Sequence, residues 1–349
     1  MISEKRKRKN IPPPAHPSAG PLKPELWTEF FRGDRLACAR LISAVEGHPE
    51  WIPEVRDRII PHQKGGIRVG ITGPPGVGKS TVTAALARRA VQAGHNVGII
   101  AVDPSSPFTG GAFLGDSIRM QDLGADPKVF IRSLASREGH GGLSPSTPHA
   151  ADILDAYGKD RIFIETVGVG QAELDILTCA DLIILVLQPG TGDIIQALKA
   201  GILEAADLFL VNKADLPGTD SLLDSLRFLF DISARTRADS APPILAAAAT
   251  LDRGLDEVYA LMEKQIRGLV QSGAYGRKKR RLMEQEIRAA IQQNLWERFA
   301  ELSRAADEIP RVAEGIVERR ESPYPYIRNV CSQIKIQFGT KKVCREKSK

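Results

Sequence analysis

A lysine, a serine and several glycines stand at a spacing suited to holding a chain of phosphates. The spacing G-x-x-x-x-G-K-[ST] is met by Gly73, Gly78, Lys79 and Ser80, after an apolar run and before a helical pattern. Glycines let successive backbone N–H groups turn toward a phosphate, and the N-terminus of a following helix adds partial positive charge. The Lys79 ammonium would contact the β- and γ-phosphates, and the Ser80 hydroxyl would bind Mg²⁺. The expected phosphate-binding loop consists of Gly73, Pro74, Pro75, Gly76, Val77, Gly78, Lys79, Ser80 and Thr81.

A second polar motif predicts which base is bound. Asn212, Lys213 and Asp215 form an N-K-x-D motif directly after the apolar run 208–211. The Asp215 carboxylate can accept hydrogen bonds from N1–H and the exocyclic amine of guanine, and the Lys213 stem can stack on the base. Adenine lacks this pair of donors and would leave the carboxylate unpaired, a penalty that gives discrimination on the order of 10⁴. The motif therefore predicts binding of GTP rather than ATP.

Carboxylates follow two further apolar runs. Glu165 stands where Mg²⁺ would be held, directly or through water, and Gly168 would let its backbone N–H approach the γ-phosphate. Asp103 ends another run, and Asp116 follows a Gly/Ser/Pro-rich loop that can close over a magnesium nucleotide when the third phosphate is present. Helix capping is the structural alternative for Asp103 and Asp116.

The elements that must position these residues alternate between strand and helix. Seven apolar runs predict strands at 68–72, 97–102, 129–133, 162–166, 182–187, 208–211 and 244–247. Helical patterns between and after them lie at 82–93, 148–157, 194–204, 221–229 and 255–269. This order predicts an α/β fold: a doubly wound, mostly parallel sheet that binds its ligand at the carboxyl ends of the strands.

The residues before this domain read as a tail and a helical preface. Residues 1–24 are basic and Pro-rich and are expected to be a disordered tail. Apolar residues at helical spacing predict a helix from Glu25 to Ala44, within a helical segment at 25–60. The GTPase domain is expected at 61–270.

A long charged helical pattern follows the domain, at 277–306, and carries one apolar stripe. A second copy of the chain is an economical partner for this stripe, and folding back onto its own domain explains the pattern equally well. We expect a helical dimerisation arm at 271–321, a homodimer, and a basic tail at 322–349.

The composition excludes several other classes of protein. Of 349 residues, 42% are hydrophobic and 26% charged, and the four cysteines form no C-x-x-C pair, which argues against a zinc site or a disulfide framework and fits a reducing cytosol. The apolar runs are shorter than the roughly 20 residues that a membrane helix needs. The net charge of +6 comes largely from basic runs without interleaved aromatics. We expect a cytoplasmic protein with no membrane or nucleic-acid partner.

Taken together, the motifs resemble the MeaB/ArgK-type GTPases, chaperones of methylmalonyl-CoA mutase within the SIMIBI class of P-loop GTPases. The resemblance rests on Gly73 to Ser80, Asp103 to Gly111, Leu114 to Met120, Glu165 to Gln171 and Asn212 to Asp215. It implies a homodimeric GTPase that docks on a cobalamin-dependent acyl-CoA mutase, gates cofactor loading and protects the loaded enzyme. Carried over by position, Mg²⁺ is bound by Ser80, Asp103, Asp116 and Glu165, and guanine by Asn212, Lys213 and Asp215.

The sequence departs from the family pattern at two loops. Ala248, Ala249 and Thr250 stand where the family usually has Ser-Ala-Leu, whose backbone contacts guanine O6, and a backbone contact can survive this change. Ile194 follows an aspartate where the family has Glu and then Leu, in a loop implicated in signalling to the mutase. The ending from Ser322 also differs from the usual family ending.

The expected reaction is in-line attack of water on the γ-phosphate, with Mg²⁺ and Lys79 offsetting the developing charge. Val169 directly follows Gly168, where Ras-type GTPases carry a glutamine that positions water, and a valine cannot do so. We expect slow intrinsic hydrolysis that a partner accelerates. The candidate catalytic residues are Lys79, Glu165, Gly168 and, as a helper, Gln171.

Three other functions share part of this pattern. A GTPase metallochaperone for another metalloenzyme would need a cluster of His or Cys, and the six histidines lie apart in the sequence. A kinase, the older proposal behind the ArgK label, should turn over ATP. A non-catalytic module would bind GTP without hydrolysing it.

Overall fold

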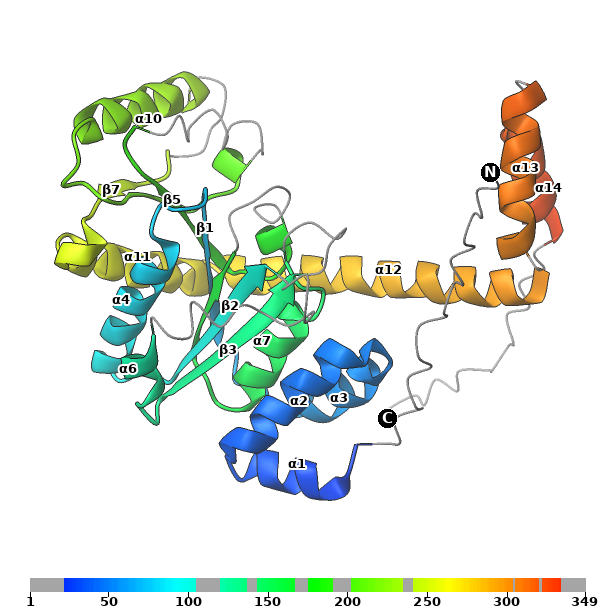
Figure 1. The fold of residues 1–349 in the computed structure, drawn as a ribbon, viewed down its shortest axis with the longest axis horizontal. Helices are drawn as coiled ribbons and strands as arrows, with labels where there is room; N and C mark the ends of the chain where they lie inside the picture. The colour runs from blue at the N-terminus through cyan, green and yellow to red at the C-terminus, as the bar shows by residue number, and fades with distance from the viewer. Residues whose placement is uncertain are drawn as a thin grey trace, which may run out of the picture. The chain divides into compact units, whose positions relative to one another are not determined.

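The computed structural model describes residues 22–104, 120–136, 143–166, 175–190, 202–234, 241–303, 305–319 and 322–333. The chain divides into two compact units, Met1–Lys278 and Lys279–Lys349. Within the described residues, the first unit contains a seven-stranded sheet with helices, and the second contains helices alone (Figure 1).

All pairings among the seven strands of the sheet are parallel. The strands are β1 (Ile67–Thr72), β2 (Val97–Pro104), β3 (Val129–Ser136), β4 (Arg161–Glu165), β5 (Leu182–Leu187), β6 (Leu208–Val211) and β7 (Ile244–Ala246), in the spatial order β3-β2-β4-β1-β5-β6-β7. The predicted fold class is therefore confirmed. Since β1 lies between β4 and β5, the loop that follows β1 is flanked by the carboxyl ends of both neighbours.

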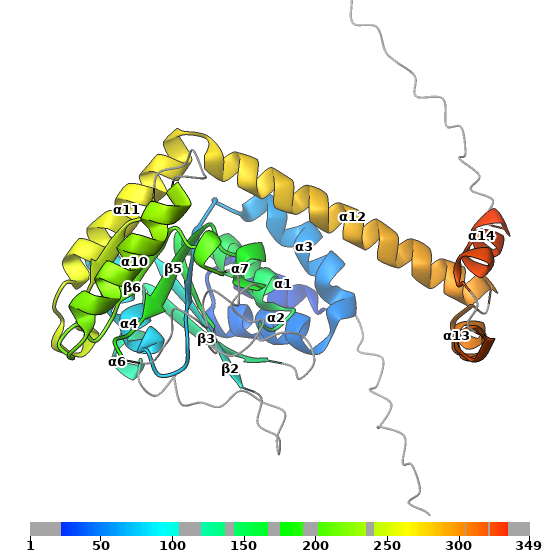
Figure 2. The same cartoon turned by 90° about the horizontal axis from the view of Figure 1, so that it is seen from above.

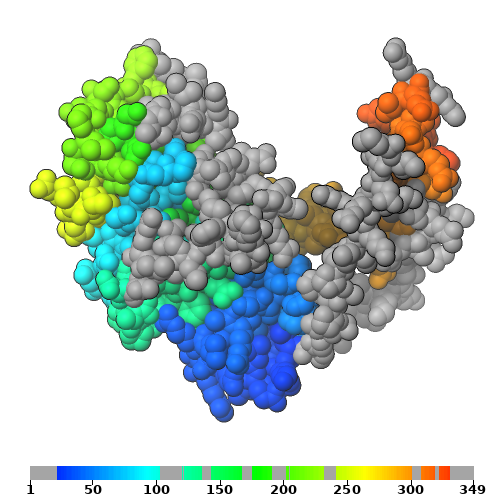
Figure 3. Space-filling view, in the orientation of Figure 1, coloured from blue at the N-terminus to red at the C-terminus, as the bar shows by residue number. Residues whose placement is uncertain are grey.

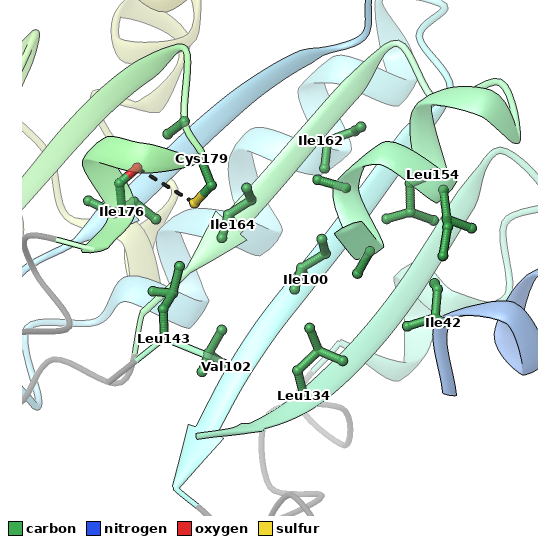
Figure 4. Packing of buried hydrophobic residues seen from close by; sticks show 14 of the residues in the cluster. Ile42, Ile100, Val102, Leu134, Leu143, Leu154, Ile162, Ile164, Ile176 and Cys179 are labelled. Carbon is green, nitrogen blue, oxygen red and sulfur yellow. Dashed lines mark hydrogen bonds between the residues drawn. The ribbon is translucent and has the colours of Figure 1, made fainter. Parts of the chain in front are cut away.

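Helices cover both faces of the sheet, as continuous apolar strands require. One core contains residues such as Ile99 and packs against α4 (Lys79–Gln92), α6 (Gln121–Gly124) and α11 (Leu255–Gln271). Figures 1 and 2 both show α4 and α11 side by side. The other core contains Ile100 and packs against α7 (Thr147–Ala156), α10 (Thr219–Ala234) and the N-terminal helices. Figure 4 shows Ile100 in this second core, with Leu134, Ile164, Leu154 of α7 and Ile42 of α2.

The N-terminal segment forms three helices, α1 (Pro24–Phe31), α2 (Arg35–Gly47) and α3 (Ile52–Ile59). The prediction of one continuous helix from Glu25 to Ala44 is wrong. Gly33 has φ +86° and ends the first helix, and the Asp34 side chain accepts a hydrogen bond from Ala37 N at 2.7 Å, which caps the second. Arg132 of β3 pairs with Glu46 of α2, so α2 lies against this edge strand. Figure 3 shows the N-terminal helices, in blue, packed against the rest of the first unit.

Short 3₁₀ turns complete the first unit. They are η1 (Pro49–Trp51), η2 (Ile60–His62), η3 (Ile176–Thr178), η4 (Ile202–Glu204) and η5 (Ala249–Leu251). Most of the helix predicted at 194–204 lies outside the described residues. Of the described helices, none combines the length and apolar character that crossing a membrane requires.

The remaining helices are α12 (Ala274–Ser303), α13 (Ala305–Arg319) and α14 (Tyr324–Gln333). The first turns of α12 belong to the first unit, where Tyr275 Oη donates to Gly65 O at 3.3 Å and Lys278 Nζ donates to Asp181 O at 3.1 Å. Further along α12, an exposed apolar row comprises Met283, Ile287, Ile291 and Leu295. The long helix predicted after the α/β domain is thus present.

Candidate nucleotide site

The turn between β1 and α4 is closely packed against other strands. Gly73, Gly76 and Gly78 have φ values of +142°, +80° and +92°, a region that favours glycine. A Cβ on Gly73 would lie 2.1 Å from the carbonyl oxygen of Val186 in β5, and a Cβ on Gly78 would lie 2.4 Å from Asn212 Nδ2. Neither position has room for a methyl group. The loop can therefore keep this backbone path and its packing against Val186 and Asn212 because residues 73 and 78 are glycines.

Lys79 is the first residue of α4 and is only 6% exposed. Its Nζ donates to Gly73 O and to Pro74 O, each at 2.9 Å. The ammonium therefore lies inside the turn that the sequence predicts to surround the phosphates. Both carbonyls are neutral acceptors, so anionic phosphate oxygens, which carry the opposite charge, would bind the ammonium more strongly.

Ser80 and Glu165 meet beside this turn. Ser80 Oγ donates to Glu165 Oε1 at 2.5 Å, and Glu165 is 3% exposed at the carboxyl end of β4. Glu165 is in register with Ile71 of β1 and Ala101 of β2, so it lies between the loop and the end of β2. A hydroxyl and a carboxylate are the oxygen donors that Mg²⁺ prefers. This pair of donors fits the predicted magnesium site.

Asn212 connects the phosphate loop with a second loop. It follows β6, is 2% exposed, and its Nδ2 donates to Val77 O at 2.7 Å. Its Oδ1 accepts from Ala249 N at 3.0 Å. A single side-chain amide thus holds together residues of the two predicted sites, one for phosphate and one for the base. This double contact is a positioning role that the motif alone did not reveal.

Lys213 and Asp215, which the sequence predicts to bind the base, follow Asn212. Lys213 has φ +57°, and its Nζ donates to Gly76 O at 2.7 Å, while Asp215 is exposed. The backbone from Ala248 to Arg253 folds back on itself in an antiparallel bridge between those two residues. We name residues 248–253 the base loop. Because its contact with Asn212 runs through the backbone of Ala249, alanine can stand here in place of a polar residue.

A cavity of about 520 Å³ lies between the base loop and α4. Its lining residues come from α4, the base loop and the first turn of α11 and are Ser80, Thr81, Ala84, Ala85, Arg88, Arg89, Gln92, Ala249, Thr250, Asp252 and Asp256. The sequence did not predict the arginine and the two aspartates that pair across this cavity, because 163 and 167 residues separate them. No short-range spacing signals such a pair.

Several predicted site residues lie outside what the structure describes. Asp116, Gly168 and Gln171 are beyond the described ranges, and of Asp103 only the backbone, in β2, is described. Among the residues whose side chains are described, no group of three or more His, Cys, Asp and Glu is placed to hold a metal ion. The roles of Asp103, Asp116, Gly168 and Gln171 therefore stay predictions.

Comparison with known families identifies the fold and its class of activity. The sequence model of the family described as "Methylmalonyl Co-A mutase-associated GTPase MeaB" matches residues 38–304. The chain belongs to the MeaB family. This confirms the resemblance inferred from the motifs, and the GTPase names of MeaB-family relatives support GTP hydrolysis at the level of the family.

The relatives extend from archaea to mammals. A Pyrococcus abyssi protein whose name classes it as a GTPase is 45% identical over 269 residues, which cover 76% of this chain and 83% of the relative. GTPase ArgK of Escherichia coli is 35% identical over 236 residues, 65% of this chain and 71% of the relative. The mouse protein named methylmalonic aciduria type A homolog, mitochondrial, is 30% identical over 318 residues, 85% of this chain and 76% of the relative.

A solved structure shares the MeaB-family fold. The crystal structure titled LAO/AO transport system kinase superposes with a TM-score of 0.66 at 23% sequence identity, covering 89% of this chain and 97% of that chain. At this identity the likeness shows the fold alone.

Proposed function

We propose that the chain is a GTP-binding and GTP-hydrolysing switch that docks on a cobalamin-dependent acyl-CoA mutase of the methylmalonyl-CoA mutase type. In this role it gates loading of the cofactor and protects the loaded enzyme, as a metallochaperone does. The observation that carries the nucleotide part is the amide of Asn212, which bonds Val77 O on one side and Ala249 N on the other. The mutase part is supported by the description of the MeaB family and by the name of the mouse relative.

The phosphate loop supplies the charge for hydrolysis. Lys79 Nζ exchanges its bonds to the carbonyls of Gly73 and Pro74 for oxygens of the β- and γ-phosphates, and it stabilises the charge that develops during attack by water. With Val169 after Gly168, the loop lacks a side chain there that could orient the water, so intrinsic turnover is slow. Gln171 is the proposed helper, together with the backbone N–H of Gly168.

Magnesium would be held by oxygen donors from Ser80 at the start of α4, Glu165 at the end of β4, Asp103 in β2, and Asp116. Ser80 and Glu165 are the described donors, and Asp103 and Asp116 complete the proposed set. The bound ion supplies positive charge that offsets the charge on the transferring phosphoryl group. Glu165 keeps its carboxylate buried and directed at Ser80, which prepares the site for a cation.

Guanine recognition is tested by calorimetry with GDP, ADP and XDP on the wild type and on Asp215→Asn. The wild type should prefer GDP over ADP by on the order of 10³ or more. The variant should lose about 100-fold in GDP affinity and gain affinity for XDP, because an amide can donate to the second carbonyl of xanthine. ADP affinity should stay unchanged.

The exposed Asp220 in the first turn of α10 offers a matched control, Asp220→Asn. Equal affinity of the wild type for GDP and ADP would reject guanine recognition. Rapid turnover of ATP would instead support the kinase function.

The mutase partner is tested by retrieving the nucleotide-loaded protein from extracts of its own cells and assaying the retained proteins for acyl-CoA mutase activity. Retention that depends on a GTP analogue, and loss of retention with Lys79→Ala, are the expected results. Retention of no cobalamin enzyme in either nucleotide state would contradict this part of the proposal.

We also propose that the chain forms a homodimer through the helical segment 271–321. The exposed apolar row on α12 supports this, because residues four positions apart lie on one helix face and have 43% to 58% of their surface exposed. Sedimentation equilibrium should give twice the mass of the chain, and a monomer at micromolar concentration would contradict the proposal.

A further inference from the structure

Arg89 lies on α4, the helix that begins at the phosphate loop, and it pairs with two carboxylates from another part of the chain. Its Nη2 donates to Asp252 Oδ1 at 3.0 Å, and its Nε donates to Asp256 Oδ1 at 2.7 Å. Asp252 belongs to the base loop and Asp256 to the first turn of α11. One guanidinium therefore connects three elements: α4, the base loop and α11.

The far end of the base loop has few other attachments among the described contacts. The amide of Asn212 holds Ala249, at the beginning of the loop, and the bridge between Ala248 and Arg253 closes its base. Between them, Thr250 and Leu251 are exposed, and Asp252 has φ +54°, in the left-handed region. Among the side-chain hydrogen bonds of the described residues, the one from Arg89 to Asp252 joins this tip to α4.

The burial of Arg89 makes this link well defined. Its side chain is 11% exposed, whereas the side chains of Asp252 and Asp256 are 70% and 85% exposed. A third bond, from Nη1 to Ala85 O at 3.3 Å, fixes the guanidinium on its own helix. Burial lowers the pKa of Arg89, but the hydrogen bonds that it donates to Asp256 and Asp252 outweigh this effect and raise the pKa overall. The guanidinium therefore stays protonated, as arginine side chains do in proteins.

Ion pairs with exposed carboxylates add little to the free energy of unfolding, because water and salt screen them. A guanidinium that joins three elements can nevertheless fix where a surface loop lies, since its donors have a rigid geometry. The effect of Arg89 is therefore expected in the position of the base loop rather than in the stability of the fold.

We propose that Arg89 is a positioning residue for guanine selectivity: by holding Asp252 it fixes where the base loop lies relative to α4, and so where the backbone of this loop meets the base. This inference rests on the proposed guanine recognition, and it adds a residue that lies outside both nucleotide motifs. Without Arg89, the tip of the base loop at residues 250–252 loses its fixed position, while Ala249 and the phosphate loop, both bonded to Asn212, stay in place.

Calorimetry with GDP, IDP and ADP on the wild type, Arg89→Ala and Arg89→Lys tests this inference. Arg89→Ala should weaken GDP binding about ten-fold, or about 1.4 kcal/mol, and change ADP binding less than about two-fold. IDP lacks the exocyclic amine of guanine but keeps the six-position carbonyl. Its binding should be weakened by Arg89→Ala to the same extent as the binding of GDP. Arg89→Lys should recover part of the loss, because an ammonium can keep one of the two contacts.

Variants on the carboxylate side separate positioning from a general structural role. Asp252→Ala alone should also weaken GDP binding. When it is added to Arg89→Ala, the affinity for GDP should fall by less than about a further two-fold, because the two side chains act as a pair. Additive losses would overturn the inference. Since Asp252 is exposed, this variant also provides a test if Arg89→Ala does not fold.

Arg227→Ala is the matched control, because it removes an exposed Arg–Asp pair within α10. It should leave GDP affinity unchanged. Equal weakening of GDP and ADP by Arg89→Ala would show that Arg89 supports the fold rather than base selectivity. A wild type with no preference for GDP would refute the proposed function, whereas a wild-type preference that persists in Arg89→Ala would refute only this inference.

Discussion

The two ends of the site use polar side chains in opposite ways. At the base end, Asn212 and Arg89 bond to other segments of the chain, and those bonds can persist when a nucleotide binds. At the phosphate end, Lys79 bonds to carbonyls of its own loop, and Ser80 bonds to Glu165. These are the groups that phosphate oxygens and Mg²⁺ would contact. We therefore expect the base end to keep its bonds when a nucleotide binds, and the phosphate end to exchange its existing bonds for bonds to the ligand.

The largest expected effect comes from removing the Lys79 ammonium, whose present hydrogen bonds a phosphate would replace. Lys79→Ala should reduce the GTPase rate constant roughly 10³-fold, because Lys79 is the cation expected to offset charge on the γ-phosphate, whereas Lys213, which also bonds to this loop, is expected to contact the base. GTP affinity should also fall, as measured by calorimetry beside single-turnover assays. The exposed Lys64 offers a control, Lys64→Ala. Turnover that survives Lys79→Ala would break the proposed contrast between the ends.

A smaller effect is expected from the hydroxyl partner. Ser80→Ala should raise the Mg²⁺ concentration that gives half-maximal hydrolysis about ten- to a hundred-fold, because the site loses one oxygen donor. GDP affinity measured in EDTA should be unchanged, since the base end is intact. The control Ser225→Ala removes an exposed hydroxyl that bonds its own helix. An unaltered Mg²⁺ dependence would exclude Ser80 from the metal site.

No effect on nucleotide binding is expected from a polar pair that lies away from both the base end and the phosphate end of the site. Arg161 and Glu263 form a two-point contact at 2.8 and 2.9 Å between β4 and α11. Burial raises the pKa of Glu263, but the hydrogen bond and the charge of Arg161 outweigh it and lower the pKa below 4.5. At pH values above the pKa of Glu263 in the unfolded state, the ionised carboxylate therefore stabilises the folded state. This stabilisation is lost as pH falls through the lower pKa of Glu263 in the folded state.

Glu263→Gln should cost about 1 to 2 kcal/mol of unfolding free energy at neutral pH. The cost should shrink as pH falls below 4.5, measured by urea denaturation across this range. Glu257→Gln, at an exposed position of α11, is the control. A cost that does not change with pH would mean that the pair contributes through packing rather than charge.

Short sequence patterns predicted the individual strands and the two nucleotide motifs of this fold. Strands β5 and β6 match their predicted ranges because uninterrupted apolar runs identify buried parallel strands. The phosphate loop and the N-K-x-D motif were also evident, since fixed spacings carry their chemistry. The break between α1 and α2 was missed because Gly33 and Asp34 interrupt an otherwise continuous helical pattern.

Contacts between distant segments could not be predicted. Nothing in the spacing of Asn212 indicates that its amide bonds both Val77 and Ala249, and nothing near Arg89 indicates its partners. Such pairs depend on how the strand order brings separate loops to one edge of the sheet. A single sequence contains no signal for that order beyond the alternation of strands and helices.

The contact between Gly78 and Asn212 makes two sequence signatures into one packing unit. A side chain at position 78 would displace the Asn212 amide and release the backbone N–H of Ala249, far from the phosphates. A substitution in the glycine motif would then alter which base is accepted. Since Gly78 also has φ +92°, a side chain there would be strained even if residue 212 changed with it, so glycine at position 78 serves both signatures although 134 residues separate it from Asn212.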